Sequence, residues 1–120
     1  FMVGKYDSAD LYAKTILERG AVNASAVNKA SLFLGKTAYS RGDLESAKDE
    51  FLNTLNMAQD EYGAEAKYML GLIFYQQKDY AQCYKTLVGL NNDFSSYEFW
   101  VGKSFLLLAD NALAQNDIFQ

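Results

Sequence analysis

Apolar residues recur every three or four positions along most of the chain, and this spacing predicts helices. No segment alternates apolar and polar residues as a half-buried strand would. Six segments follow the helical pattern: residues 6–19, 25–41, 43–59, 64–77, 79–90 and 95–115. The pattern therefore predicts an all-α protein of about six helices.

Residues that commonly begin or end helices stand between these segments. Glycine readily adopts the left-handed conformation that closes a helix, and it stands where three segments stop, at Gly20, Gly42 and Gly63. Side chains that can cap the first turn of a helix open four segments: Ser25, Asp43, Asp79 and Ser95. The connections are short, so we expect successive helices to pack antiparallel.

A short motif recurs three times, in which apolar residues precede a glycine. The three glycines are Gly35, Gly71 and Gly102, and aromatic residues follow each of them. After the first two copies come a turn and then a small residue, Ala47 or Cys83. Glycine inside a helix costs about 0.5–1 kcal/mol relative to alanine. We therefore expect two helices to cross closely at each of these glycines.

The motif resembles the tetratricopeptide repeat, a helix-turn-helix unit of about 34 residues with a W-x2-L-G-x2-Y…A-x3-F pattern. The best matches are Leu34-Gly35…Ala47…Phe51 and Leu70-Gly71…Phe74…Cys83…Leu87. The chain departs from the pattern, because the leading Trp is replaced throughout and the closing Pro is missing. The intervals between the glycines are 36 residues (71 − 35) and 31 residues (102 − 71). The repeat is therefore a degenerate one.

The resemblance implies a solenoid of antiparallel helix hairpins, wound as a right-handed superhelix, over residues 1–120 as a single domain. Fuller units are expected at 25–60 and 64–92, and partial units at 1–20 and 95–120. In the last unit the turn is expected at Asn116, seven residues later than in the other two. We therefore expect the chain to be part of a longer array.

Composition narrows the chemistry of the chain. Its 120 residues include 15 acidic and 11 basic side chains, with a net charge of −4. This balance disfavours nucleic acid as a partner, since phosphate binding needs clustered Lys and Arg. The chain has no histidine, one cysteine and no glycine-rich phosphate loop. We therefore expect no catalytic residues, no metal and no cofactor, and we expect a protein that is not an enzyme. No run of about 18 apolar residues occurs, so no membrane insertion is expected.

In tetratricopeptide arrays the first helix of each unit lines a concave groove. The resemblance therefore implies a groove that binds another protein, through a peptide or a partner helix. The implied groove residues are Lys29, Leu32, Lys36, Tyr39, Tyr68, Leu72, Tyr75, Gln76, Phe99 and Lys103. The alternative is that these side chains pack against neighbouring helices, or against a part of the solenoid that lies outside this chain. Trp100 is expected in the core.

The resemblance favours an interaction scaffold or adaptor. The style of residues 64–96 is similar to that of bacterial envelope repeat proteins, which favours the periplasm or envelope over the cytoplasm. Two alternatives remain open at this point. The chain can be a structural spacer or oligomerisation arm that associates with itself through residues 99–108. It can also be the regulatory domain of a larger enzyme or transcription factor.

Overall fold

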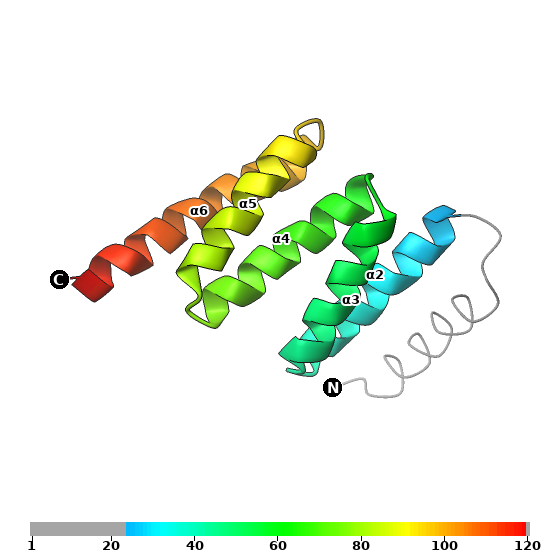
Figure 1. Cartoon of the computed structure of the whole chain (residues 1–120), viewed down its shortest axis with the longest axis horizontal. Helices are drawn as coiled ribbons and strands as arrows, with labels where there is room; N and C mark the ends of the chain where they lie inside the picture. The colour runs from blue at the N-terminus through cyan, green and yellow to red at the C-terminus, as the bar shows by residue number, and fades with distance from the viewer. Residues whose placement is uncertain (1–23, 120) are drawn as a thin grey trace.

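The structure, a computed structural model, describes the backbone of residues 24–119 and the side chains of residues 26–116. This part of the chain consists of five α-helices and contains no strand (Figure 1). The helices are α2 (Ala24–Ser40), α3 (Leu44–Met57), α4 (Glu61–Gln76), α5 (Tyr80–Asp93) and α6 (Glu98–Phe119). The all-α prediction is confirmed. The predicted helix 6–19 and its terminal Gly20 lie outside the described residues.

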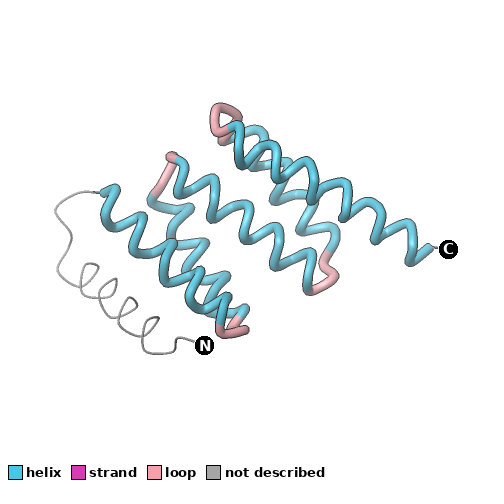
Figure 2. The backbone as a smooth tube through the Cα atoms, turned by 180° about the vertical axis from the view of Figure 1, so that it is seen from behind, coloured by secondary structure: helices cyan, strands magenta, loops and turns pink. Residues whose placement is uncertain are grey.

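The five helices form two layers, and consecutive helices run in opposite directions (Figure 1). Helices α2, α4 and α6 make one layer, which faces the viewer in Figure 2, and α3 and α5 make the other. Helix α4 contacts α2 and α6 within its own layer, and it also contacts α3 and α5. It is therefore the element through which the two hairpins, α2–α3 and α4–α5, and the last helix are joined.

The core follows this arrangement. One buried cluster joins α2, α3 and α4, and its members are Leu32, Ala47, Phe51, Ala66, Leu70 and Ile73. A second cluster joins α5 and α6 through Cys83, Leu87 and Leu107. Two side-chain hydrogen bonds also hold α6, because Asn91 Nδ2 donates to Ser104 Oγ (3.0 Å) and Asn111 Nδ2 donates to the carbonyl oxygen of Tyr80 (3.1 Å).

Two of the three motif glycines lie where helices cross closely. A Cβ atom on Gly35 would lie 2.6 Å from Cε1 of Phe51, and one on Gly71 would lie 2.5 Å from Cδ2 of Leu87. Those distances are too short for a side chain, so both predictions of a close crossing are confirmed. The prediction is wrong for Gly102. That residue is exposed and its Cβ would meet nothing within 4 Å, because none of the described helices covers that side of α6.

The turns inside the two hairpins have the same geometry. Gly42 has φ 81° and Lys78 has φ 63°, both in the left-handed region. The next residue, Asp43 or Asp79, caps the following helix by accepting a hydrogen bond from the backbone N–H of Ser46 (3.2 Å) or Gln82 (3.3 Å). Both predicted aspartate caps are confirmed.

Two predicted helix boundaries before α4 and α2 are wrong. Gly63 does not end a helix, because α4 begins at Glu61 and contains it. The cap is Asp60, whose carboxylate accepts hydrogen bonds from the N–H groups of Tyr62 (3.0 Å) and Gly63 (3.3 Å). A Cβ on Gly63 would collide with the carbonyl oxygen of Ala58, so glycine is needed here for packing. Ser25 does not cap α2, since that helix already includes Ala24.

Both ends of α6 also differ from the prediction. The helix begins at Glu98, so Ser95 does not cap it. Phe94 is buried, its ring lies 6.2 Å from that of Tyr97, and the N–H of Tyr97 donates to the carbonyl oxygen of Phe94 (3.0 Å), so a turn precedes the helix. At the other end α6 continues to Phe119, so no turn occurs at Asn116.

Candidate functional site

The outward face of the layer α2–α4–α6 carries the predicted groove residues. On α4, residues 65, 68, 72, 75 and 76 lie on one side of the helix. The buried Leu70 and Ile73 lie on the other sides, towards the neighbouring helices. The equivalent positions of α2 are 36 residues earlier. Exposed members of the predicted set are Lys29, Lys36, Gln76 and Phe99, and half-buried members are Tyr39, Tyr68, Leu72, Tyr75 and Lys103.

Leu32 is the exception within this set. It is 4% exposed and belongs to the core cluster with Ala66 and Ile73 of α4. Its side chain is covered by the neighbouring helix of the same layer, so it cannot contact a partner. The assignment of Leu32 to the groove is corrected, and the alternative of packing against a neighbouring helix applies to it.

Polar contacts join α2 to α4 across this face. Lys36 Nζ lies 2.7 Å from Oε2 of Glu65, and the Tyr39 hydroxyl accepts a hydrogen bond from Nε2 of Gln76 at 2.7 Å. An ion pair near the surface contributes only about 0–1 kcal/mol. Half of the Lys36 side chain remains accessible. These groups can therefore exchange their present partners for those of a bound segment.

An aromatic cluster with a central lysine joins α4 to α6. The rings of Tyr68 and Trp100 are 5.6 Å apart, and those of Trp100 and Phe99 are 4.9 Å apart and nearly perpendicular. Lys103 Nζ lies 5.0 Å from the centroid of Tyr68, 5.5 Å from that of Trp100 and 5.6 Å from that of Phe99, within range of cation–π attraction. Trp100 is half-buried in this cluster and is not the core residue that the sequence predicts.

The ionisable groups near this face are suited to non-covalent contact. Burial raises the pKa of the Tyr68 hydroxyl, and the nearby Tyr39 and Asp110 raise it further, so this group stays neutral at physiological pH. Burial also raises the pKa of the Cys83 thiol to about 11. That thiol is protonated and fully buried. Within residues 26–116 no group of three or more His, Cys, Asp or Glu side chains is placed to hold a metal ion.

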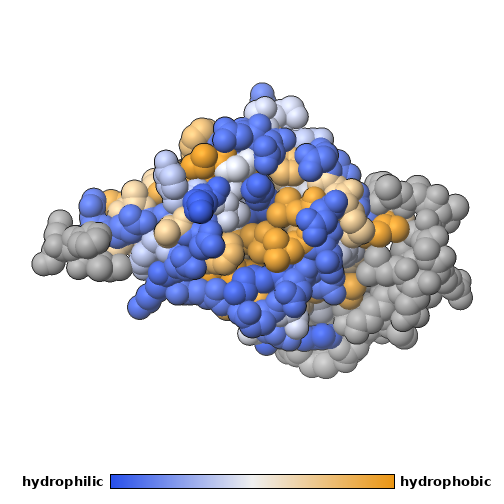
Figure 3. Space-filling model, in the orientation of Figure 1, coloured by the Kyte–Doolittle hydropathy of each residue, from blue (hydrophilic) through white to orange (hydrophobic). Residues whose placement is uncertain are grey.

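Sequence reasoning missed a hollow on the opposite layer. A pocket of about 300 Å³ opens between α3 and α5, and α4 forms its floor. Figure 3, seen from this side, shows apolar surface there with hydrophilic residues around it. Its lining residues are Leu52, Leu55, Lys67, Leu70, Phe74, Gln82, Lys85 and Thr86. A hint of this pocket in the sequence is Leu52. It is an apolar residue of α3 that does not belong to the buried face of the helix, and in the structure it is exposed.

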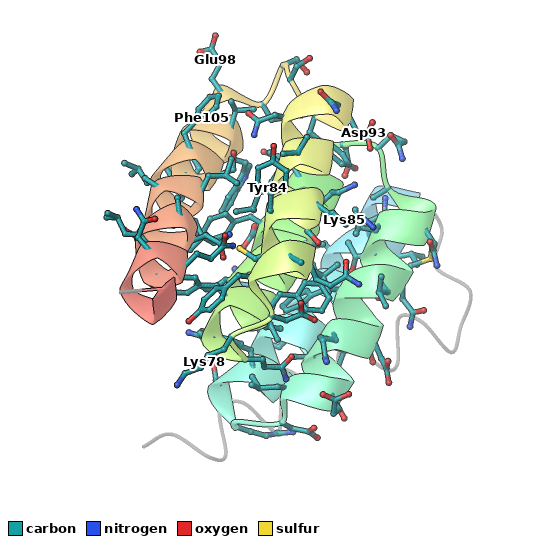
Figure 4. The ribbon with its side chains drawn as sticks, turned by 60° about the vertical axis from the view of Figure 1, so that its left-hand side comes forward. Lys78, Tyr84, Lys85, Asp93, Glu98 and Phe105 are labelled. Atoms are coloured by element: carbon teal, nitrogen blue, oxygen red, sulfur yellow. The ribbon has the colours of Figure 1, made fainter. Side chains whose placement is uncertain are left out.

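Sequence reasoning also missed how α6 presents its apolar residues. Phe105, Leu106 and Leu113 are exposed, although the helix is packed on α5 and α4. Figure 4 shows Phe105 projecting from α6 on the side away from α5. The sequence offered residues 99–108 as a segment for self-association, but it did not indicate which of its residues face outwards.

The two described hairpins repeat each other, and this repeat can be compared with those of known proteins. Equivalent residues of the two described hairpins, such as Gly35 with Gly71 and Asp43 with Asp79, are 36 positions apart. None of the helices within residues 24–119 combines the length and the apolar character needed to cross a membrane. No protein-family model matches the chain, and comparisons with curated proteins and with solved structures likewise gave no match.

Proposed function

We propose that this chain is a tetratricopeptide-type solenoid that acts as a protein–protein interaction scaffold or adaptor, not as an enzyme. In this proposal the face of α2, α4 and α6 binds a peptide or a helix of another protein. The observation that carries the proposal is one surface of tyrosines and lysines that runs across three helices, from Tyr39 through Tyr68 to Lys103.

The repetition of the two hairpins supports the solenoid part of the proposal. The close crossing at Gly35 recurs at Gly71, and the left-handed turn at Gly42 recurs at Lys78. Units that repeat in this way stack with a constant rotation, which creates an extended concave surface. The right-handed superhelix and further units on either side belong to the proposal. The proposal also includes a setting in the bacterial envelope, and this part rests on the sequence resemblance alone.

The side chains on this face suggest the chemistry of the partner segment. Tyrosine and tryptophan offer a large contact area with few rotatable bonds, and they dominate binding energy at many interfaces. Lys36 and Lys103 lie among them. We therefore propose that the bound segment combines apolar or aromatic residues with carboxylates.

Site-specific photo-crosslinking tests which layer binds the partner. Tyr75 lies on the proposed face and Tyr84 is an exposed tyrosine on α5, in the other layer. Each is replaced in turn by p-benzoylphenylalanine, in the native host cell, and crosslinked proteins are identified by mass spectrometry. The proposal expects one defined partner from position 75 and not from position 84. The same partner from position 84 alone contradicts it.

Affinity measurements with the identified partner provide the second part of the test. We expect Tyr68→Ala to weaken binding about tenfold or more, because it removes the ring that contacts both Trp100 and Lys103. Tyr84→Ala is the matched control and is expected to leave the dissociation constant unchanged. Circular dichroism verifies that both variants keep their helicity. An unchanged affinity for Tyr68→Ala removes this residue from the binding surface.

A further inference from the structure

Helix α6 carries a stripe of apolar residues on its outward side. The stripe consists of Phe99, Gly102, Leu106, Ala109 and Leu113, spaced by 3, 4, 3 and 4 residues, so all five lie along one side of the helix. All five are exposed, and the three large side chains are 67%, 72% and 62% accessible. The opposite side of α6 faces α5 with the buried Ser104, Leu107 and Asn111.

Gly102 makes this stripe accessible to another helix. Phe51 fills the space beside Gly35 and Leu87 fills the space beside Gly71, but the space beside Gly102 is open in the described part of the molecule. A large side chain from another helix can therefore approach the backbone of α6 at this point. Contiguous exposed apolar surface of this kind commonly marks an interaction site.

The stripe is complementary to itself when two copies of α6 run antiparallel. Large and small residues alternate along it, so in one register Leu106 and Leu113 each lie opposite a small residue, and Phe99 lies opposite the polar Asn116. In that register Leu106 packs against Ala109 of the second copy, and Leu113 packs against Gly102 of the second copy. A parallel arrangement would instead place Gly102 opposite Gly102, which leaves a gap. It would also place Leu106 opposite Leu106, where the two side chains would be crowded.

The residues beside the stripe are complementary in the same register. Lys103 and Asp110 lie on one edge, and Phe105 and Ala112 lie on the other. In the antiparallel pair Lys103 of each copy faces Asp110 of the other, and Phe105 of each copy faces Ala112 of the other. Opposite charges at such flanking positions select partner and orientation.

From the stripe and its two edges we infer that two copies of this chain form a two-fold symmetric dimer through antiparallel α6 helices. A two-fold interface uses the same patch on both subunits and closes on itself. In the 120-residue chain it therefore covers both apolar stripes, including the space beside Gly102 that a further helix after α6 would take in a longer solenoid. The dimer surface shares Phe99 and Lys103 with the proposed binding face, but it does not include Tyr75, the position at which crosslinking tests the scaffold role.

The mass of the 120-residue chain in solution tests this dimer, using light scattering after size-exclusion chromatography. We expect a dimer for the unmodified chain and a monomer for Gly102→Leu, since the new side chain has open space in the monomer but occupies the place of Leu113 of the second copy. Leu106→Asp is also expected to be monomeric. Leu52→Asp, an exposed leucine on α3, is the matched control and remains dimeric. Circular dichroism verifies that each variant is folded.

Charge reversal tests the antiparallel register. Asp110→Lys places two lysines opposite each other and is expected to raise the dissociation constant about tenfold or more, which corresponds to about 1.4 kcal/mol. Adding Lys103→Asp to this variant restores the opposite charges and is expected to restore dimerisation. A chain that stays monomeric up to about 1 mM overturns the inference. So does an oligomer that survives Gly102→Leu and Leu106→Asp, an open-ended assembly, or charge reversal without rescue.

Discussion

Gly35 and Gly71 each lie beneath a side chain of the next helix, whereas Gly102 lies beneath none of the described residues. The three glycines share one sequence motif, but only two of them have a packing role within the described chain. Glycine costs helix stability wherever it occurs. At Gly35 and Gly71 this cost is offset by the close approach of Phe51 and Leu87, and at Gly102 nothing in this part of the chain offsets it.

Alanine substitutions at the three glycines should therefore differ in sign. We expect Gly35→Ala and Gly71→Ala to lower the free energy of unfolding by about 1–3 kcal/mol, because the added methyl forces a buried side chain to move. The larger effect is expected at Gly35, where the obstacle is the rigid ring of Phe51. Gly102→Ala is expected to raise the free energy of unfolding by about 0.5–1 kcal/mol. Urea unfolding at a protein concentration low enough to keep the chain monomeric measures all three, and equal effects would contradict the packing argument.

Leu32 illustrates why the candidate surface could be predicted only in part at this scale. It is equivalent to Tyr68, 36 residues later, and the resemblance to tetratricopeptide repeats led us to expect both positions in the groove. Leu32 is too short to extend past α4, whereas the ring of Tyr68 reaches Trp100 and Lys103. Position along a helix is a property of the sequence. Accessibility depends on the length of the side chain and on the size of its neighbours in space.

At the scale of elements, the two hairpin turns also place residues of different type at equivalent positions. Gly42 and Lys78 are equivalent, and both adopt a positive φ before an aspartate cap. A left-handed conformation costs a residue other than glycine about 1–2 kcal/mol. The exposed Lys78, at the turn between α4 and α5 (Figure 4), therefore carries a strain that Gly42 does not.

Exchanging the residues of the two turns tests this strain. Lys78→Gly is expected to raise the free energy of unfolding by about 1 kcal/mol, since the gain in the turn exceeds the added entropy of the unfolded chain. Gly42→Lys is the reciprocal variant and is expected to be destabilising by a similar amount. Thermal and urea unfolding measure both. A loss of stability in Lys78→Gly would show that the lysine side chain has a compensating role.

Helix boundaries could be predicted where local chemistry determines them. Asp43 and Asp79 bind N–H groups only three residues ahead, so the sequence near the turn is sufficient to identify them as caps. Ser95 has an equally suitable side chain, but it lies in a turn that begins at Phe94, which is buried. Gly63 is required by the position of the Ala58 carbonyl group. Such contacts depend on how the flanking helices are oriented.

For the whole molecule, α4 is the element on which the arrangement depends. It contacts all four of the other described helices, and its Leu70 and Ile73 lie in the main core cluster. Helix α6 lies at one end of the layer and contacts only α4 and α5 among the described helices. Helices at the end of such an arrangement can open separately, because their loss exposes little of the rest.

Substitutions in α4 and in α6 should therefore differ in how many helices they destabilise. Ile73→Ala is expected to cost about 2–5 kcal/mol and to reduce hydrogen-exchange protection in α2, α3, α4 and α5 together. Leu107→Ala, also a buried position, is expected to reduce protection mainly in α6. Hydrogen exchange followed by mass spectrometry measures the effect helix by helix. Uniform loss of protection in both variants would indicate a single cooperative unit.

The helical type and the alternating direction of the described helices could be predicted, since both depend on periodicity and on short connections. Which helices share a layer could not be derived from periodicity, and it entered through the family resemblance. The hollow between α3 and α5 was not predicted, because it depends on how far apart two helices of one layer lie. The exposed stripe of α6 was not predicted for a similar reason, as it depends on which side of the helix remains uncovered.

The equivalence of the turns at Gly42 and Lys78 has a consequence for how chains of this type change in length. Recombination between the two turns would remove residues 43–78 and join Gly42 directly to Asp79. Helix α5 would then take the place of α3, with its aspartate cap in position and with Leu87 beside Gly35, still 16 residues along the shortened chain. The reverse event would insert one further hairpin. The length of one hairpin can therefore be lost or gained while every remaining helix keeps its phase and packs against an equivalent neighbour.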